Sequence, residues 1–124
     1  MALVSPGIHR VLDLVTVVAF ALAPAVIGLA GFAAALAYIL AVVHLIVTLS
    51  TEFSGNARRP LPLHGHGAIE AIVGVALIGL PFVAGWTGAA RIFYIAAGAV
   101  ILLVRAVSDY RVQRDSGGAA LPLG

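Results

Sequence analysis

The sequence contains no cysteine, no lysine and few charged residues of any kind. The absence of cysteine excludes disulfides, thiolate metal sites, iron–sulfur clusters and c-type haem attachment. Charged residues make up only 10% of the 124 residues and the net charge is +2, which is too small and too scattered for nucleic-acid binding. Hydrophobic residues make up 62%, and the mean hydropathy is +1.13. This composition is typical of a protein embedded in a lipid bilayer.

The longest uncharged stretch covers residues 14–51, where no Asp, Glu, Lys or Arg occurs. As one helix it would be roughly twice as long as a hydrocarbon core is thick, so it must contain two membrane spans. Two similar apolar runs follow in the second half of the chain. We therefore predict an all-α membrane protein with four transmembrane helices, at residues 8–30, 32–50, 68–84 and 90–112. They form a single domain at 1–112, and residues 113–124 are expected to be a disordered cytoplasmic tail.

The two halves of the chain match each other when one is shifted along the other so that His9 falls on His66. We call this displacement the repeat shift. It also places Asp13 on Glu70, Pro24 on Pro81, Gly28 on Gly85, Gly31 on Gly88, and Thr51-Glu52-Phe53 on Ser108-Asp109-Tyr110. The sequence therefore predicts two tandem helical hairpins, repeat one at 8–53 and repeat two at 65–110, joined by a linker at 54–64. The glycines of the segment His64-Gly65-His66-Gly67 predict a flexible entry to the third span.

The distribution of arginine predicts how the chain crosses the membrane. Only Arg91 lies near the junctions inside the two repeats. The remaining arginines lie on the side of the two termini and the linker: Arg10, Arg58, Arg59, Arg105, Arg111 and Arg114. Arginine favours the cytoplasmic side, so we expect a multi-pass protein of the bacterial inner membrane with both termini in the cytoplasm. Repeats that enter from the same side are parallel repeats, related by a pseudo-twofold axis along the membrane normal.

The second repeat also carries a motif around its proline. Residues 70–86 read EAIVGVALIGLPFVAGW: an early acid, a glycine seven residues before the proline, an aromatic residue directly after it, then glycine and tryptophan. This pattern resembles the SPW-repeat family of small bacterial membrane proteins. The chain departs from the family at Leu80 and Phe82, where the family has Ser and Trp. The resemblance implies a four-span membrane protein and brings no established activity with it.

Most ionisable side chains fall in one layer, at the predicted cytoplasmic ends of the spans. This candidate polar layer comprises His9, Asp13, His66, Glu70, Glu52, Arg105 and Asp109. His9 and Asp13 are four residues apart and therefore share one helical face, and the same spacing recurs in His66 and Glu70.

Three interpretations of the layer remain open. In the first, the layer is structural and Arg105 is the counter-ion of Asp13, Glu70 or Asp109, because an unpaired carboxylate is costly in a membrane. In the second, the layer binds a metal, since histidines and carboxylates suit Zn, Mn or Fe. In the third, Asp13 and Glu70 carry protons or cations across the membrane.

His44 lies about two helical turns deeper than the end of its span. It is either a histidine satisfied by a backbone carbonyl or Thr48, or a haem ligand, or a proton relay. The repeat shift places His44 on Ile101, so one chain cannot provide a symmetric pair of histidines to a haem.

No motif for phosphate binding or hydrolysis is present, so we expect no enzymatic activity. The leading functional prediction is a structural or accessory membrane protein that self-associates or packs against a larger membrane complex. Its partner would be the lipid bilayer, with no nucleic acid and no cofactor. The alternatives are a small proton- or cation-coupled transporter or channel, and a haem- or metal-binding membrane protein.

Overall fold

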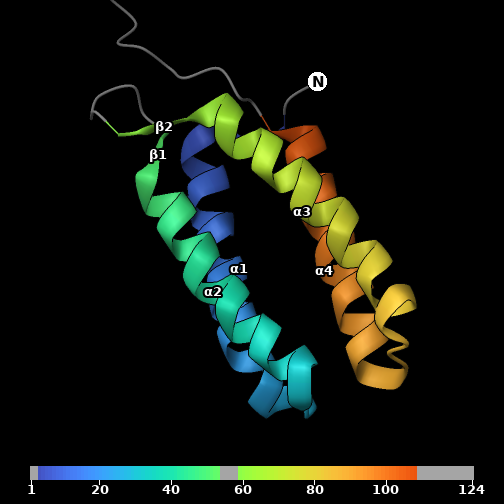
Figure 1. Ribbon diagram of the computed structural model, residues 1–124. Helices are drawn as coiled ribbons and strands as arrows, with labels where there is room; N and C mark the ends of the chain where they lie inside the picture. The colour runs from blue at the N-terminus through green and yellow to red at the C-terminus, as the bar shows by residue number, and fades with distance from the viewer. Residues whose placement is uncertain (1–2, 54–58, 109–124) are drawn as a thin grey trace, which may run out of the picture.

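The computed structural model describes residues 3–53 and 59–108, which form four long helices and two very short strands (Figure 1). Their bounds are α1 (Pro6–Ile27), α2 (Gly31–Ser50), β1 (Thr51–Glu52), β2 (Leu61–Pro62), α3 (Leu63–Ala84) and α4 (Gly88–Val107). The predicted helical architecture is therefore confirmed for this part of the chain. The predicted tail at 113–124 and the last residues of the predicted fourth span lie outside the described residues.

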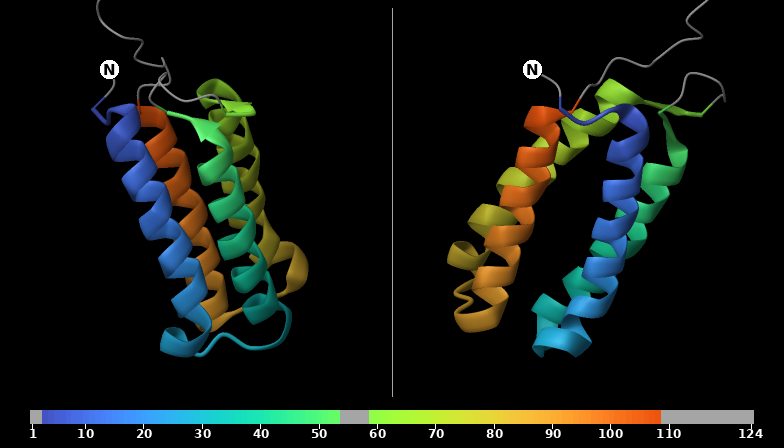
Figure 2. Two further views of the ribbon diagram at one scale, coloured as in Figure 1. Left: turned by 90° about the vertical axis from the view of Figure 1, so that its left-hand side faces the viewer. Right: turned by 180° about the vertical axis from the view of Figure 1, so that it is seen from behind.

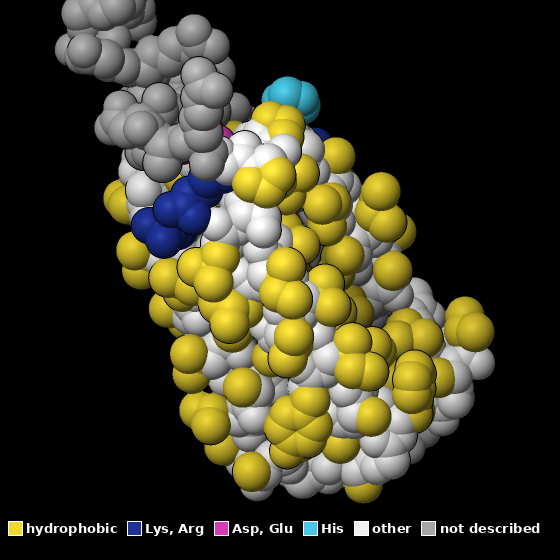
Figure 3. Space-filling model, turned by 60° about the vertical axis from the view of Figure 1, so that its left-hand side comes forward, with side chains coloured by type: hydrophobic (Ala, Val, Ile, Leu, Met, Phe, Trp, Pro, Cys, Tyr) yellow, Lys and Arg dark blue, Asp and Glu magenta, His cyan; other side chains and the backbone are white. Residues whose placement is uncertain are grey.

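Each of the four helices is long enough and apolar enough to cross a membrane. Large apolar side chains point outward along all four, for example Val15, Ile46, Ile72 and Leu103. In Figure 3, hydrophobic side chains cover the length of the visible face and arginine side chains lie near one end. A surface of this kind is suited to hydrocarbon rather than to water.

The helices form two antiparallel hairpins, α1 with α2 and α3 with α4 (Figure 1). Gly28 and Gly85 end α1 and α3 with φ of +71°, and Gly31 and Gly88 begin the next helices with φ of +56° and +60°. Residues with a side chain rarely adopt positive φ, so these glycines make the tight turns possible. We call this end of the molecule the turn end and the opposite one the polar end. In Figure 2 (right) the two hairpins stand side by side, with the turn end at the bottom.

At the polar end, two short backbone pairings tie the helices together. β1 and β2 are parallel, with Thr51 opposite Leu61, and a single bridge joins Val4 to Ser108. Helix α3 begins at Leu63, so the segment predicted as a flexible entry is helical instead. Contacts of the His66 ring with Thr51 and Asp13 explain the difference, because tertiary contacts override the low helix propensity of glycine.

Small residues allow close packing within the second hairpin. A Cβ on Gly98 of α4 would lie 2.5 Å from the carbonyl oxygen of Gly74 in α3, so only glycine permits this approach.

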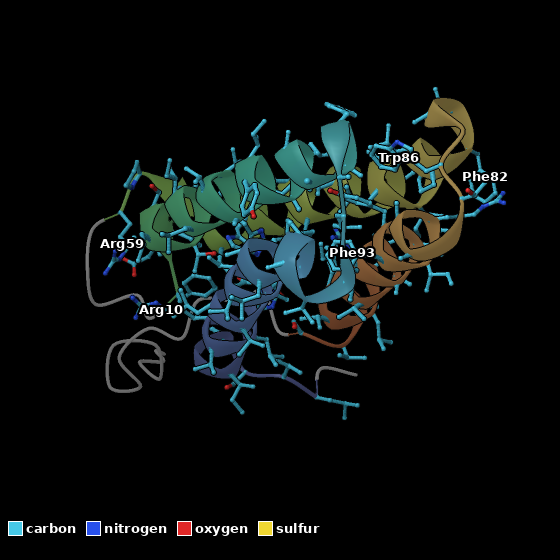
Figure 4. The ribbon with its side chains drawn as sticks, turned by 90° about the horizontal axis from the view of Figure 1, so that it is seen from below. Arg10, Arg59, Phe82, Trp86 and Phe93 are labelled. Atoms are coloured by element: carbon cyan, nitrogen blue, oxygen red, sulfur yellow. The ribbon has the colours of Figure 1, made fainter. Side chains whose placement is uncertain are left out.

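Aromatic side chains join the two hairpins nearer the turn end. The Tyr94 hydroxyl donates a hydrogen bond to the Ala33 carbonyl at 2.6 Å, and the Phe20 and Phe93 rings lie 5.7 Å apart. Figure 4, viewed from the turn end, shows Phe93 between α1 and α4.

Candidate metal centre

Four ionisable side chains from two different hairpins meet at the polar end. His9 and Asp13 lie on α1, and His66 and Glu70 lie on α3. Each pair is four residues apart, so both members face the same way. All four are buried, with at most 4% of any residue exposed. We call these four residues the His–carboxylate cluster. Because α1 and α3 belong to different hairpins, the cluster connects the two halves of the fold.

The potential ligand atoms of the cluster converge closely. His66 Nε2 lies 2.8 Å from both Asp13 Oδ2 and Glu70 Oε1. His9 Nε2 lies 3.0 Å from Glu70 Oε1 and 3.4 Å from Asp13 Oδ2. One atom from each residue can be chosen so that all four lie within 4.8 Å of one another. Ligands of one tetrahedral ion, with bonds of about 2.0–2.1 Å, are separated by about 3.3 Å. The four side chains can therefore reach a common ion with small movements.

The outer nitrogen of each histidine ring is held by a hydroxyl from the other hairpin. His9 Nδ1 lies 2.7 Å from Ser108 Oγ, and His66 Nδ1 lies 2.8 Å from Thr51 Oγ1. Each hydroxyl also donates to the carbonyl four residues earlier in its own helix, at 2.5 and 2.6 Å respectively. A hydroxyl has only one proton, so it must accept a hydrogen bond from Nδ1–H. Each neutral ring therefore presents the lone pair of Nε2 to the cluster.

In this protonation state, hydrogen-bond acceptors face one another and no proton lies between them. The Nε2 lone pairs face the carboxylate oxygens, so the cluster requires either added protons or a cation. With added protons, both Nε2–H groups are aimed at Glu70 Oε1. Asp13 Oδ2 is buried, and its contacts with described residues are ion pairs with His66 Nε2 at 2.8 Å and with His9 Nε2 at 3.4 Å. A cation between the four atoms would satisfy all of them.

His44 of α2 lies directly beside this cluster. Its Nε2 is 3.5 Å from Asp13 Oδ1, and its ring centre is 6.1 Å from that of His66. The hydrogen bond to Thr48 considered from the sequence is not formed, because His44 Nε2 and Thr48 Oγ1 both lack a hydrogen-bond partner among the residues described. The space between Nε2 and Asp13 is too narrow for a porphyrin, which argues against haem at this nitrogen.

Arg105 makes a contact with the backbone of the neighbouring helix. Its Nε donates to the Gly67 carbonyl at 2.8 Å, close to the start of α3. The ion-pair partners of Asp13 within the described segments are the three histidines of this region. Arg105 is therefore not the counter-ion of Asp13, whereas Asp109, another partner considered for it, lies outside the described residues. Histidines on three helices surround this carboxylate, and the sequence predicted the closeness of His9 but not that of His44 or His66.

The remaining members of the predicted polar layer lie apart from the cluster or cannot be placed. Glu52 is half-buried in β1, and Asp109 lies outside the described residues. Three contacting residues were given no role from the sequence: Thr51, Ser108 and Phe53. The Phe53 ring lies 5.3 Å from the His66 ring and 6.0 Å from the His9 ring. The match of Thr51 with Ser108 under the repeat shift was the available signal for the two hydroxyls.

The donor set indicates which ions fit. Imidazole nitrogens and carboxylate oxygens without thiolate suit Zn²⁺, Mn²⁺ and Fe²⁺. Metal-bound histidines usually donate their other N–H to a fixed acceptor, as both rings do here. The inner ligands and their outer partners are thus both present.

Comparisons with protein-family models, with curated proteins and with solved structures found no match to this chain. Its function therefore has to be inferred from its own residues.

Proposed function

We propose that this chain is a small, non-enzymatic integral membrane protein that binds one divalent transition-metal ion between its two hairpins. The proposed ligands are His9, Asp13, His66 and Glu70. The supporting observation is the convergence of these four buried residues, whose ligand atoms lie within 4.8 Å of one another. A cation between these atoms would bind all four residues at once, whereas protonated histidines would pair with the carboxylates one contact at a time.

The charge of the cluster supports a divalent ion. Two carboxylates and two neutral imidazoles carry a net charge of about −2, and one divalent cation makes the assembly neutral. Net charge at membrane depth is costly, so the cluster is expected to hold either one divalent cation or two added protons, each of which makes it neutral.

The origin of the proposed ligands in both hairpins supports a structural role for the metal. Each hairpin contributes one histidine and one carboxylate, so the ion would cross-link the two hairpins as structural zinc cross-links small domains. Beyond His44, the buried side chains described toward the turn end are largely apolar: Phe20, Ala37, Ala41, Leu77 and Tyr94. A polar route for a transported ion does not continue through this described core. A resident ion is therefore favoured over a transported one.

Metal binding can be tested with the full chain purified in mild detergent. After treatment with a chelator, the protein is dialysed against Zn²⁺, Mn²⁺ or Fe²⁺, and the bound metal is measured by mass spectrometry. We expect about one ion per chain, a raised melting temperature, and loss of both in Asp13→Asn, because the amide lacks the negative charge with which the carboxylate binds the cation. The matched control is His64→Ala, which removes an exposed histidine from the same helix as His66. Wild-type protein that binds none of the three metals would refute the proposal.

We also propose that the two hairpins are tandem parallel repeats related by a pseudo-twofold axis along the membrane normal. His9 of the first hairpin contacts Ser108 of the second, and the matching residue His66 of the second hairpin contacts the matching residue Thr51 of the first. This reciprocity supports the axis, and with it membership of the SPW-repeat family.

The arginine distribution supports a bacterial inner-membrane location with both termini in the cytoplasm. A topology reporter fused after Gly124 should read cytoplasmic, and one fused after Gly31 should read external. Mixed readings at both positions would contradict this orientation.

A second candidate function is a proton- or cation-coupled transporter. The contact of His44 with Asp13 favours it, because His44 extends the polar group toward the membrane interior. Flux driven by a pH gradient in liposomes, lost in the double variant Asp13→Asn with Glu70→Gln, would support transport. Wild-type liposomes without flux would leave the resident metal as the better proposal.

A further inference from the structure

His44 is an ionisable residue in α2, a helix that is otherwise largely apolar. Helix α2 contains no Asp, Glu, Lys or Arg, and its buried positions are Ala33, Ala37, Ala41 and Thr48. The His44 side chain is only 12% exposed. Its Nε2 is buried and makes no hydrogen bond to any part of the chain that the structure describes. A buried donor or acceptor is normally satisfied, and the 3.5 Å contact of this nitrogen with Asp13 Oδ1 is too long for a hydrogen bond, so a closer partner can be accommodated.

The orientation of Asp13 shows where that partner would lie. Asp13 Oδ2 faces His66 and His9, whereas Oδ1 faces His44 Nε2 at 3.5 Å. An ion held by both oxygens of this carboxylate would lie between the cluster and α2. Neighbouring ligands of one octahedral ion, with bonds of about 2.1 Å, are about 3.0 Å apart. His44 Nε2 is therefore close to the separation expected of a ligand on the same ion.

We propose that His44 is a third imidazole ligand of the metal centre, so that the ion has more than four protein donor atoms. This inference rests on the proposed metal-binding function and specifies the class of metal. Three imidazoles, Glu70 and a carboxylate that binds through both oxygens offer five or six donors. Such a set favours Fe²⁺ or Mn²⁺ over a closed tetrahedral Zn²⁺ site.

A positioning role for His44 is the competing explanation. In that case Nε2–H donates to Asp13 Oδ1, holds the carboxylate in place and never touches the ion. The two roles predict different coordination spectra but similar losses of affinity. Affinity alone therefore cannot decide between them.

The deciding experiment uses the wild-type chain and two variants loaded with Co²⁺ or Cu²⁺ in detergent. His44→Ile introduces the residue that the second hairpin has at the matching position, Ile101. Thr48→Val is the control, since it removes a buried hydroxyl one turn away on the same face of α2. Visible absorption of Co²⁺ reports the coordination number, and electron paramagnetic resonance of Cu²⁺ reports the number of nitrogen ligands.

We expect wild type and Thr48→Val to show weak Co²⁺ bands of five or six ligands, and three nitrogens on Cu²⁺. His44→Ile should give intense tetrahedral Co²⁺ bands, two nitrogens and an affinity lower on the order of tenfold or more. Two nitrogens in the wild type would overturn the inference and leave the four-ligand metal site intact; this measurement needs no variant to fold. Absence of binding to the wild type would instead refute the metal-binding function itself.

Discussion

The first hairpin, α1 with α2, and the second hairpin, α3 with α4, share the residues that hold the histidines of the His–carboxylate cluster in place. In both, a histidine near the start of the first helix is fixed through Nδ1 by a hydroxyl at the end of the other hairpin: Ser108 for His9 and Thr51 for His66. In both, the hydroxyl also donates to the carbonyl four residues before it. This shared set lies entirely at the polar end.

The hairpins differ along their second helices. His44 of α2 corresponds under the repeat shift to Ile101 of α4, so only Asp13 has a third histidine beside it. Ala37 of α2 corresponds to Tyr94 of α4, and both are fully buried. The small residue leaves space and the large one fills it and reaches the backbone of the opposite hairpin. Matching residues thus build the His–carboxylate cluster. Differing residues place a third histidine beside Asp13 and a hydrogen bond from Tyr94 to the other hairpin.

The strongest test of the shared set removes one histidine at a time. His9→Leu and His66→Leu should each lower metal affinity by more than the roughly 10–100-fold that loss of an outer hydrogen-bond partner costs. The two losses should be similar because both rings are fixed in the same way. Isothermal titration with Zn²⁺ measures them. If one of the two substitutions left the metal affinity unchanged, the two hairpins would not contribute equivalent ligands.

The two hydroxyls provide a finer test of the same equivalence. Thr51→Val and Ser108→Ala should each weaken metal binding by roughly 10–100-fold, since each frees the Nδ1–H that orients a ligand. A competition titration against a chelating dye gives the affinities. Thr16→Val is the control, because its hydroxyl bonds to the Leu12 carbonyl within α1 and not to a ligand of the cluster. Unequal effects of the first two substitutions would show that the outer contacts are not interchangeable.

The close helix approach in the second hairpin can be disrupted without touching the cluster. In Gly98→Ala the new Cβ would meet the Gly74 carbonyl, and backbone cannot move aside cheaply, so we expect a loss of about 1–3 kcal/mol in unfolding free energy. Gly79→Ala is the matched control, because a Cβ there would meet nothing within 4 Å. Denaturant unfolding in detergent compares the two. Equal stabilities would contradict the tight packing of α3 on α4.

The smallest expected effect concerns the link between the hairpins near the turn end. Tyr94→Phe removes the hydrogen bond to the Ala33 carbonyl and should cost about 1 kcal/mol of unfolding free energy, with metal affinity unchanged. Tyr38→Phe on α2 is the control, since that side chain is half exposed. A large loss of metal affinity in Tyr94→Phe would mean that the turn end and the polar end do not act independently.

Much of the fold could be predicted from the sequence because its signals are local. The lack of charge over residues 14–51 required two helices, and the paired glycines at 28 and 31 and at 85 and 88 marked the turns. The start of α3 was placed too late because His64-Gly65-His66-Gly67 has weak helix propensity. Contacts of His66 with Thr51 and Asp13 make that segment helical, and helix propensity takes no account of such contacts.

The candidate site was only partly predictable. The spacing of His9 with Asp13 and of His66 with Glu70 placed each pair on one helical face, and the internal match related the pairs to each other. Nothing in the spacing could show that His44 faces Asp13, or that Arg105 donates to the Gly67 carbonyl. Those contacts depend on how helices rotate and cross, which is set by packing across the whole hairpin.

The sequence by itself determined the number of helices, their apolar character, the turns and the pairing of a histidine with a carboxylate in each half. These features follow from hydropathy, glycine conformation and the helical period, all of which act over a few residues. Only the tertiary structure decided that both pairs meet in one buried cluster. It also decided that Thr51 and Ser108 hold the two Nδ1 atoms, and that Asp13 Oδ2 has no hydrogen bond within the described segments. The physical reason is that ligand geometry depends on contacts between α1, α2, α3 and α4, and residues far apart in the chain define those contacts together.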